Sequence, residues 1–144
     1  MHMKKLIKKL INPAWKRPNV SDMWLITSIS NHASFMGFVF DNVRDGEKWY
    51  IEMIFSESIQ VRLNRISKEG CPIPLTQKNI SALRPTLPDF DFGEDFVHHR
   101  ICDDQQCLFV AYDNMSHCWL SKRIDRQQMT EAAQKYGFKY SENA

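Results

Sequence analysis

Residues 106–122 read QCLFVAYDNMSHCWLSK and predict a central β-hairpin. Two apolar runs, residues 106–112 and 116–122, flank Asp113-Asn114, and both turn residues tolerate the positive φ angles of tight hairpins. Both runs are apolar on both faces, which is typical of strands in the middle of a sheet. We therefore expect the fold to be built around this hairpin.

A second hairpin is predicted around Asp45-Gly46, a dipeptide that favours type I′ turns. Pairing outward from this turn collects large apolar side chains on one face, and a slip of one residue would expose them all. Residues 23–29 and 59–63 also fit strands. The apolar face of the expected hairpin comprises Met36, Phe38, Phe40, Trp49, Ile51, Met53 and Phe55.

Helices are predicted near both ends of the chain. Asp125 and Gln128 form a capping box at the start of the C-terminal helix, and Gly137 marks its end. Residues 4–11 place apolar side chains on one helical face and lysines on the other. A proline-rich connection at 70–88 holds one further short helix, from Thr76 to Leu83.

These elements predict an α+β fold. We expect a single antiparallel sheet of about five or six strands, arranged as a hairpin meander, with an N-terminal and a C-terminal helix packed against it. Residues 1–20 form a basic arm, and residues 21–144 form one domain that includes the connection at 70–88. A chain of 144 residues is long enough to bury a core without disulfides or metals.

The net charge of +2 conceals an uneven distribution. Residues 1–20 carry six Lys and Arg and no acid, whereas the remaining residues carry 13 Lys and Arg against 17 Asp and Glu. The body is therefore mildly acidic and the arm is basic. The apolar run near the start is too short for a secretory signal, so we expect a cytoplasmic protein with reduced cysteines.

Residues 98–118 hold three of the four cysteines and three of the five histidines. Zinc sites usually repeat a close Cys pair, whereas this window has a single Cys102-x4-Cys107 and an adjacent His117-Cys118. Adjacent residues of a strand point to opposite faces, so His117 and Cys118 do not share a metal. Cys107 and Cys118 fall on the same face as other apolar residues, which favours buried structural cysteines.

Two other uses of this window remain open. One is a metal site, and the other is a redox role for the cysteines. The prediction that we favour includes no metal, no cofactor and no catalytic residue. The alternative metal ligands would come from His98, His99, Cys102 and Cys107.

Residues 87–96, LPDFDFGEDF, interleave acids with phenylalanines. Aromatic anchors inside a charged rim are typical of protein interfaces, so the segment predicts a surface that binds a basic partner. In the alternative, the three phenylalanines pack under the sheet while the acids stay in solvent. The predicted surface comprises Asp89, Phe90, Asp91, Phe92, Glu94, Asp95, Phe96, His98, Asp103 and Asp104.

With this acidic stretch, the chain resembles the small immunity proteins of bacterial toxin systems, including those of contact-dependent growth inhibition. The resemblance covers the whole chain loosely, and residues 89–104 are the local feature that fits it. It implies a non-enzymatic inhibitor that neutralises a basic partner, such as a nuclease toxin, through an acidic surface. The basic arm does not fit this pattern.

Two other functions are kept as alternatives. A small hydrolase or nuclease would use His32, His98, His99 or His117 with acidic partners, although no Walker, HExxH or nucleophile-elbow motif accompanies them. A membrane-surface or nucleic-acid binder would act through Trp15 and the cations of the arm. Those cations are Lys4, Lys5, Lys8, Lys9, Lys16 and Arg17.

Overall fold

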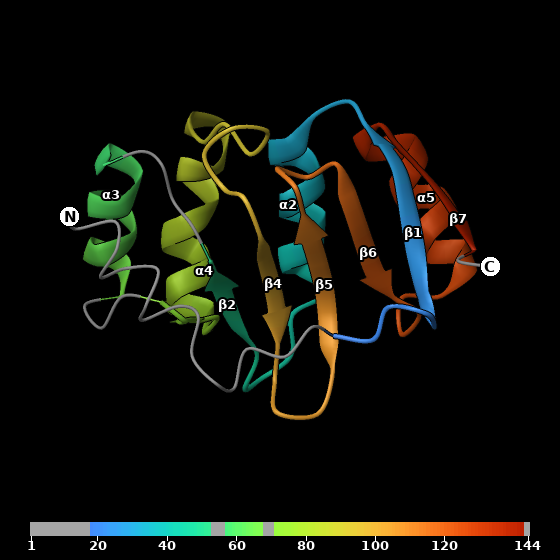
Figure 1. The fold of residues 1–144 in the computed structure, drawn as a ribbon, viewed down its shortest axis with the longest axis horizontal. Coiled ribbons are helices and arrows are strands. Elements are labelled where there is room, and N and C mark those ends of the chain that lie inside the picture. Colours follow the sequence, from blue (N-terminus) through green and yellow to red (C-terminus); the bar gives the residue numbers. More distant parts are fainter. Residues whose placement is uncertain (1–17, 53–56, 68–70, 143–144) are drawn as a thin grey trace.

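The computed structural model describes residues 18–52, 57–67 and 71–142. They contain a seven-stranded antiparallel sheet with the order β3-β2-β4-β5-β6-β1-β7 (Figure 1). The α+β prediction is confirmed, with seven strands in place of the expected five or six. The strands are β1 (Met23–Ile29), β2 (Lys48–Ile51), β3 (Ile73–Pro74), β4 (His99–Cys102), β5 (Cys107–Tyr112), β6 (His117–Ser121) and β7 (Phe138–Glu142).

Helices pack on one face of this sheet, which we call the inner face. Figure 1 shows α2 and α5 behind the strands, and one buried apolar cluster joins their side chains to those of Trp49, Phe109 and Leu120. The opposite, outer face carries the alternate residues of the same strands. The helical elements are α2 (His32–Asp41), α3 (Glu57–Ile66), α4 (Gln77–Leu83), the 3₁₀ helix η1 (Arg84–Asp89) and α5 (Arg126–Tyr136).

The central hairpin is confirmed as β5 and β6. Its register pairs Phe109 with Leu120 and Ala111 with Cys118, so the turn takes four residues and not the expected two. Three of the four turn residues, from Asp113 to Met115, have positive φ. The register differs by two residues from the predicted one, so the same side chains still point inward.

The expected strand at residues 36–41 is wrong, because residues 32–41 form the helix α2. The side chain of Asn31 caps this helix by accepting a hydrogen bond from Ser34 N at 3.0 Å. Five large apolar side chains of α2 are buried, so nearly every side of the helix is covered. The apolar positions of such a helix show little helical periodicity. Met36, Phe38 and Phe40 are spaced by two residues, as on one face of a strand, so the segment was interpreted as a strand.

The other half of the expected hairpin is β2, which pairs with β3 and β4 in place of residues 36–41. Trp49 and Ile51 do point inward as predicted. Met53 and Phe55 lie outside the described residues. Residues 59–63 are also helical, because the pair that α3 buries, Ile59 and Leu63, has the spacing of one helical turn.

The proline-rich connection is more structured than expected. It contains β3, α4 and η1, and it buries Leu75, Leu83 and Leu87. The short helix is confirmed as α4, with Thr76 as its N-cap. The predicted helix at residues 4–11 lies outside the described residues.

The C-terminal helix is confirmed as α5, with its capping box and with Gly137 in the left-handed conformation. The chain then forms β7, an edge strand that the sequence analysis missed. In the described ranges, no helix combines the length and the apolar composition that crossing a membrane requires.

Candidate functional site

Residues 89–96 form a closed turn at one end of the sheet, which we call the acidic turn. The carbonyl oxygen of Asp91 accepts hydrogen bonds from the backbone N–H groups of Glu94 at 3.1 Å and Asp95 at 2.7 Å. The carboxylate of Asp95 accepts from Asp91 N at 3.0 Å, and that of Asp91 accepts from Gly93 N at 3.1 Å. Side chains and backbone therefore fix the same conformation of the turn.

The three phenylalanines of the acidic turn point into the inner layer. Phe90, Phe92 and Phe96 are 7%, 1% and 0% exposed, and their ring centroids lie 5.1–5.8 Å apart. The interpretation of these rings as surface anchors is therefore wrong. The alternative applies, in which the rings pack under the sheet and hold the turn in place.

His99 lies beneath this turn, surrounded by the rings of Trp49, Phe92, Phe96 and Phe109. Trp49 Nε1 donates to His99 Nδ1 at 3.0 Å, and His99 Nε2 lies 3.0 Å from the sulfur of a methionine. Burial lowers the pKa of His99 to about 3, with smaller contributions from two neighbouring histidines. His99 is therefore a neutral core residue at physiological pH.

The carboxylates of the acidic turn differ in their surroundings. Asp91 and Glu94 are exposed and Asp95 is half-buried. Asp89 forms an exposed ion pair with Arg62, in which Nη1 and Oδ2 are 2.8 Å apart. Across residues 18–52, 57–67 and 71–142, no Lys or Arg forms an ion pair with Asp91, Glu94 or Asp95. Three carboxylates thus lie on a fixed turn without a neutralising cation among the described residues, and two of them, on Asp91 and Asp95, are themselves held by hydrogen bonds.

Histidines and a further acid join the acidic turn at this end of the sheet. His32, at the start of α2, lies 3.9 Å from the point that a Cβ on Gly93 would occupy. Burial lowers the pKa of His32, and the nearby Asp91 partly opposes that change.

The turn after β5 supplies further contacts at this end of the sheet. His98 Nδ1 accepts from Asp113 N at 3.1 Å. His117 Nε2 is 3.7 Å from the carboxylate of Asp113, and the side-chain amide of Asn114 donates to the carbonyl oxygen of Glu94.

Sequence reasoning missed Asp113 and Asn114 as parts of this site, and it named His32 only as a residue of the alternative hydrolase or nuclease. The first two were assigned only to a turn. A signal for them was the adjacency of strands β4 and β5, which brings the turn that follows β5 to the end of the sheet where β4 begins. His32 was not expected beside the acidic turn, because residues 36–41 were assigned to a strand and the helix α2 was not predicted.

Two residues of the predicted surface lie elsewhere. Asp103 and Asp104 follow β4, whereas the acidic turn and His98 precede it, so they sit at opposite ends of that strand. Asp103 Oδ1 accepts from the backbone N–H groups of Gln105 and Gln106, both at 2.8 Å, and these hydrogen bonds lower the pKa of Asp103. Asp103 therefore shapes its own loop, and the predicted surface is divided.

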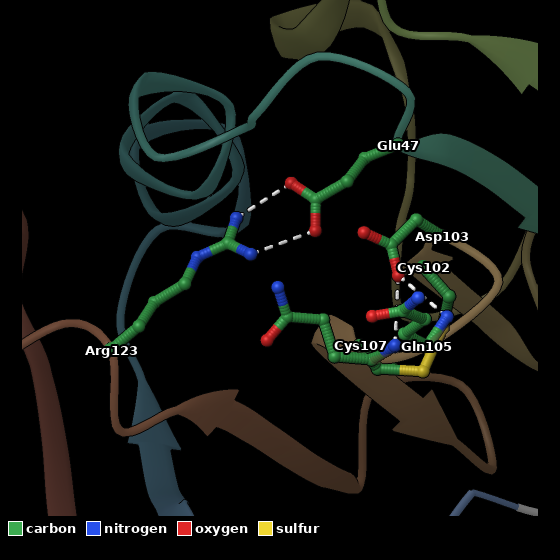
Figure 2. Close-up of a disulfide and its surroundings, with 7 residues drawn as sticks. Glu47, Cys102, Asp103, Gln105, Cys107 and Arg123 are labelled. Atoms are coloured by element: carbon green, nitrogen blue, oxygen red, sulfur yellow. Dashed lines mark hydrogen bonds and ion pairs between the residues drawn. A yellow bond between two sulfur atoms is a disulfide. The ribbon is translucent and has the colours of Figure 1, made fainter.

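Cys102 and Cys107 form a disulfide between the facing ends of β4 and β5 (Figure 2). The prediction of reduced thiols is therefore wrong for Cys102 and Cys107. The prediction that Cys107 is a free, buried cysteine is wrong as well, because its side chain is half-buried and bonded to Cys102. The register shifts between Ile101 and Cys102, which places Cys102 opposite Cys107.

The other two cysteines are free thiols. Cys118 is buried, as predicted, and burial raises its pKa to about 12. Burial also raises the pKa of Cys71 to about 11. Both thiols are therefore protonated near neutral pH, when they are poor nucleophiles and metal ligands. Within the described part of the chain, no three His, Cys, Asp or Glu residues gather as metal ligands.

A buried ion pair lies beside the disulfide. Figure 2 shows Arg123 and Glu47 facing each other in bidentate contact, with N–O distances of 2.6 and 2.9 Å. Arg123 also donates to the carbonyl oxygen of Asn42 at 2.6 Å, and Glu47 accepts from Arg44 N at 2.7 Å. The side chains are 10% and 0% exposed, so this pair joins two loops as a structural contact.

Comparison with known proteins identifies no relative. No protein-family model matches the chain, and the searches of curated proteins and of solved structures each found no match.

Proposed function

We propose that this protein is a non-enzymatic binding module that neutralises a basic partner, such as a nuclease toxin, in the manner of bacterial immunity proteins. The observation that carries the proposal is the acidic turn. It carries exposed or half-exposed carboxylates on Asp91, Glu94 and Asp95, none of which has an ion pair with a described Lys or Arg. Hydrogen bonds fix the carboxylates of Asp91 and Asp95 and the backbone of Glu94.

A fixed turn favours binding because little conformational entropy is lost when the partner docks. The buried Phe92 and Phe96 attach the turn to the inner layer, so the carboxylates hold their positions before contact. Several carboxylates gathered at one end of the sheet attract a basic partner over several ångströms and repel acidic proteins. The half-buried His98 and the exposed Asp113 extend the polar surface beside the turn.

Neutralising the turn tests this proposal. The variant Asp91→Asn, Glu94→Gln, Asp95→Asn keeps side-chain oxygens that can accept the hydrogen bonds of the turn but removes three charges. The first step is to examine the genes next to the one for this chain for a toxin with a basic C-terminal domain, and calorimetric titration would then use that domain as the candidate partner. We expect binding to weaken about tenfold or more, equivalent to at least 1.4 kcal/mol, and to depend less on salt.

The matched control neutralises three exposed acids away from the turn, Asp22→Asn, Asp45→Asn and Glu131→Gln. This variant loses the same charge, so equal weakening in both would show that only net charge matters. Unchanged affinity in the turn variant, or no binding of the toxin domain by the unmodified protein, would contradict the proposal.

A small hydrolase or nuclease is the second candidate, favoured by one observation. Three histidines, His32, His98 and His117, lie at the same end of the sheet as Asp91 and Asp113. Such groups transfer protons near neutral pH. Nuclease activity of the purified protein that disappears in His98→Gln would favour this candidate over the binding module.

A further inference from the structure

Four aromatic side chains form a continuous row on the outer face of the sheet, at the end where the acidic turn lies. On β6, the ring centroids of His117 and Trp119 lie 6.3 Å apart. The ring of Trp119 lies 5.7 Å from that of Tyr112 on β5, and Tyr112 lies 5.4 Å from His98, directly before β4. We call these four residues the outer aromatic row.

The pairing of the strands explains why these rings gather. The register pairs Tyr112 with His117, so their side chains leave the sheet on the same face. Cys118 and Leu120, which flank Trp119 in β6, belong to the inner cluster, and this alternation places the row on the outer face. His117 is exposed, and the other three side chains of the row are partly exposed.

The turn after β5 joins this row to the acidic turn. Asn114 Nδ2 donates to the carbonyl oxygen of Glu94 at 3.1 Å. Asp113 N donates to His98 Nδ1 at 3.1 Å, and the carboxylate of Asp113 lies 3.7 Å from His117 Nε2. The side chain of Asp113 is 65% exposed. The rings and the carboxylates therefore form one continuous surface.

We propose that the outer aromatic row binds an arginine side chain of the basic partner, with the guanidinium on the rings of His117 and Trp119 and beside the carboxylate of Asp113. This inference rests on the proposed function for the class of partner and adds the side chain that is recognised. A guanidinium is planar, so it stacks on aromatic rings while it donates several hydrogen bonds to a carboxylate. The ammonium of lysine is a compact, strongly hydrated charge that gains less from such a surface.

The charges around the row favour a cationic side chain over a nucleic acid. Asp113 lies against the row, and Asn114 holds Glu94 of the acidic turn beside it. The guanidinium of Arg100 lies over the ring of Tyr50 at 5.2 Å, on the side of β4 that faces away from the row. Bases that stacked on the row would bring their phosphates close to carboxylates, whereas nucleic-acid sites gather Lys and Arg.

NMR titration of the full-length protein with two peptides tests this inference. Tetra-arginine and tetra-lysine carry the same charge, so a difference between them reports the chemistry of the side chain. We expect tetra-arginine to shift the indole N–H signal of Trp119 and to bind at least about threefold more tightly than tetra-lysine. Trp119→Leu should abolish this preference and Asp113→Asn should reduce it. The matched control Tyr50→Leu should retain it, because Arg100 already occupies that ring.

Equal affinity for the two peptides, or an indole signal of Trp119 that does not shift, would overturn the inference. Both results come from the unmodified protein, so they hold even if a variant fails to fold. A larger shift of this signal with an oligothymidylate than with tetra-arginine would also overturn it, in favour of base stacking.

The peptides separate this inference from the proposed function. Binding of the toxin domain without a preference for arginine would reject the role of the row and leave the proposed function standing. A preference for arginine without binding of the toxin domain would support the role of the row and contradict only the neutralisation of a toxin.

Discussion

His99 is a histidine placed where protonation is incompatible with the folded core. In the unfolded chain a histidine binds a proton near pH 6.5, whereas burial lowers the pKa of folded His99 to about 3. Between these values the unfolded state binds more protons, so stability falls as the pH falls from 6.5 toward 3. The slope is up to about 1.4 kcal/mol per pH unit, measurable as urea unfolding midpoints at pH 7.5 and pH 5.

The variant His99→Gln should have a shallower slope, because it keeps a hydrogen-bond acceptor for Trp49 but does not titrate. His32 contributes in the same direction, since burial lowers its pKa as well, so some slope remains in the variant. His117→Gln removes an exposed histidine and serves as the control. An identical slope in the unmodified protein and in His99→Gln would contradict this prediction.

Glu47 and Arg123 form the most deeply buried ion pair of the described residues. Glu47→Gln removes the charge but keeps the shape, and it leaves the guanidinium of Arg123 buried without its counter-ion. We expect a loss of about 3–5 kcal/mol in the free energy of unfolding, measured by urea denaturation. Asp89→Asn breaks the exposed pair with Arg62 and should cost less than about 1 kcal/mol. Similar losses in the two variants would contradict the prediction.

The elements differ in how clearly the sequence marks them. Helix α5 was predicted with its capping box and its terminal glycine, because those signals are local. The central hairpin was predicted because its strands are apolar on both faces. Helix α2 was assigned to a strand, because its burial depends on contacts with the sheet and with η1, which the sequence does not show. The cap of α2 at Asn31 was not recognised, so a single local signal at one end was not sufficient to identify this helix.

The hairpin of β4 and β5 is closed in two independent ways, by the Cys102–Cys107 disulfide and by the hydrogen bonds of Asp103. Cys102→Ser with Cys107→Ser should therefore remain folded. The loop closed by the disulfide is short, so the loss should be about 2 kcal/mol by chain entropy. Urea denaturation with and without a dithiol reductant measures it.

In this experiment, reductant should lower the unfolding midpoint of the unmodified protein and leave that of the double variant unchanged. Cys71→Ser is the control, because Cys71 is a free thiol and the reductant should still act on this variant. A midpoint for the unmodified protein that does not respond to reductant would contradict the prediction. So would a double variant that fails to fold.

At the scale of the whole molecule, the candidate site depends on chain topology more than on sequence proximity. The sequence shows the acidic turn as acids that alternate with phenylalanines. Burial of the phenylalanines under the sheet was one of two interpretations of this pattern, and their exposure as interface anchors was the other. Its neighbours, His32 and Asp113, come from distant parts of the chain and meet it because α2 and the turn after β5 reach the same end of the sheet. No local pattern predicts such a meeting.

The same topology separates two acidic segments that are close in sequence. Asp103 and Asp104 follow Asp95 by only eight and nine residues, but β4 places them at the other end of the sheet. If the acidic turn is the binding surface, Asp103→Asn with Asp104→Asn should leave affinity for the basic toxin domain within about twofold, because exposed charges farther apart than a Debye length of about 8 Å are screened.

Asn at position 103 keeps the side-chain oxygen that accepts from Gln105 and Gln106, so the loop should hold its shape. The comparison is with Asp91→Asn, Glu94→Gln, measured in the same titration, because both double variants remove two negative charges. The two double variants therefore compare the same loss of charge at the two ends of β4. Weakening by Asp103→Asn, Asp104→Asn that equals or exceeds that of the turn variant would move the interface to the disulfide hairpin.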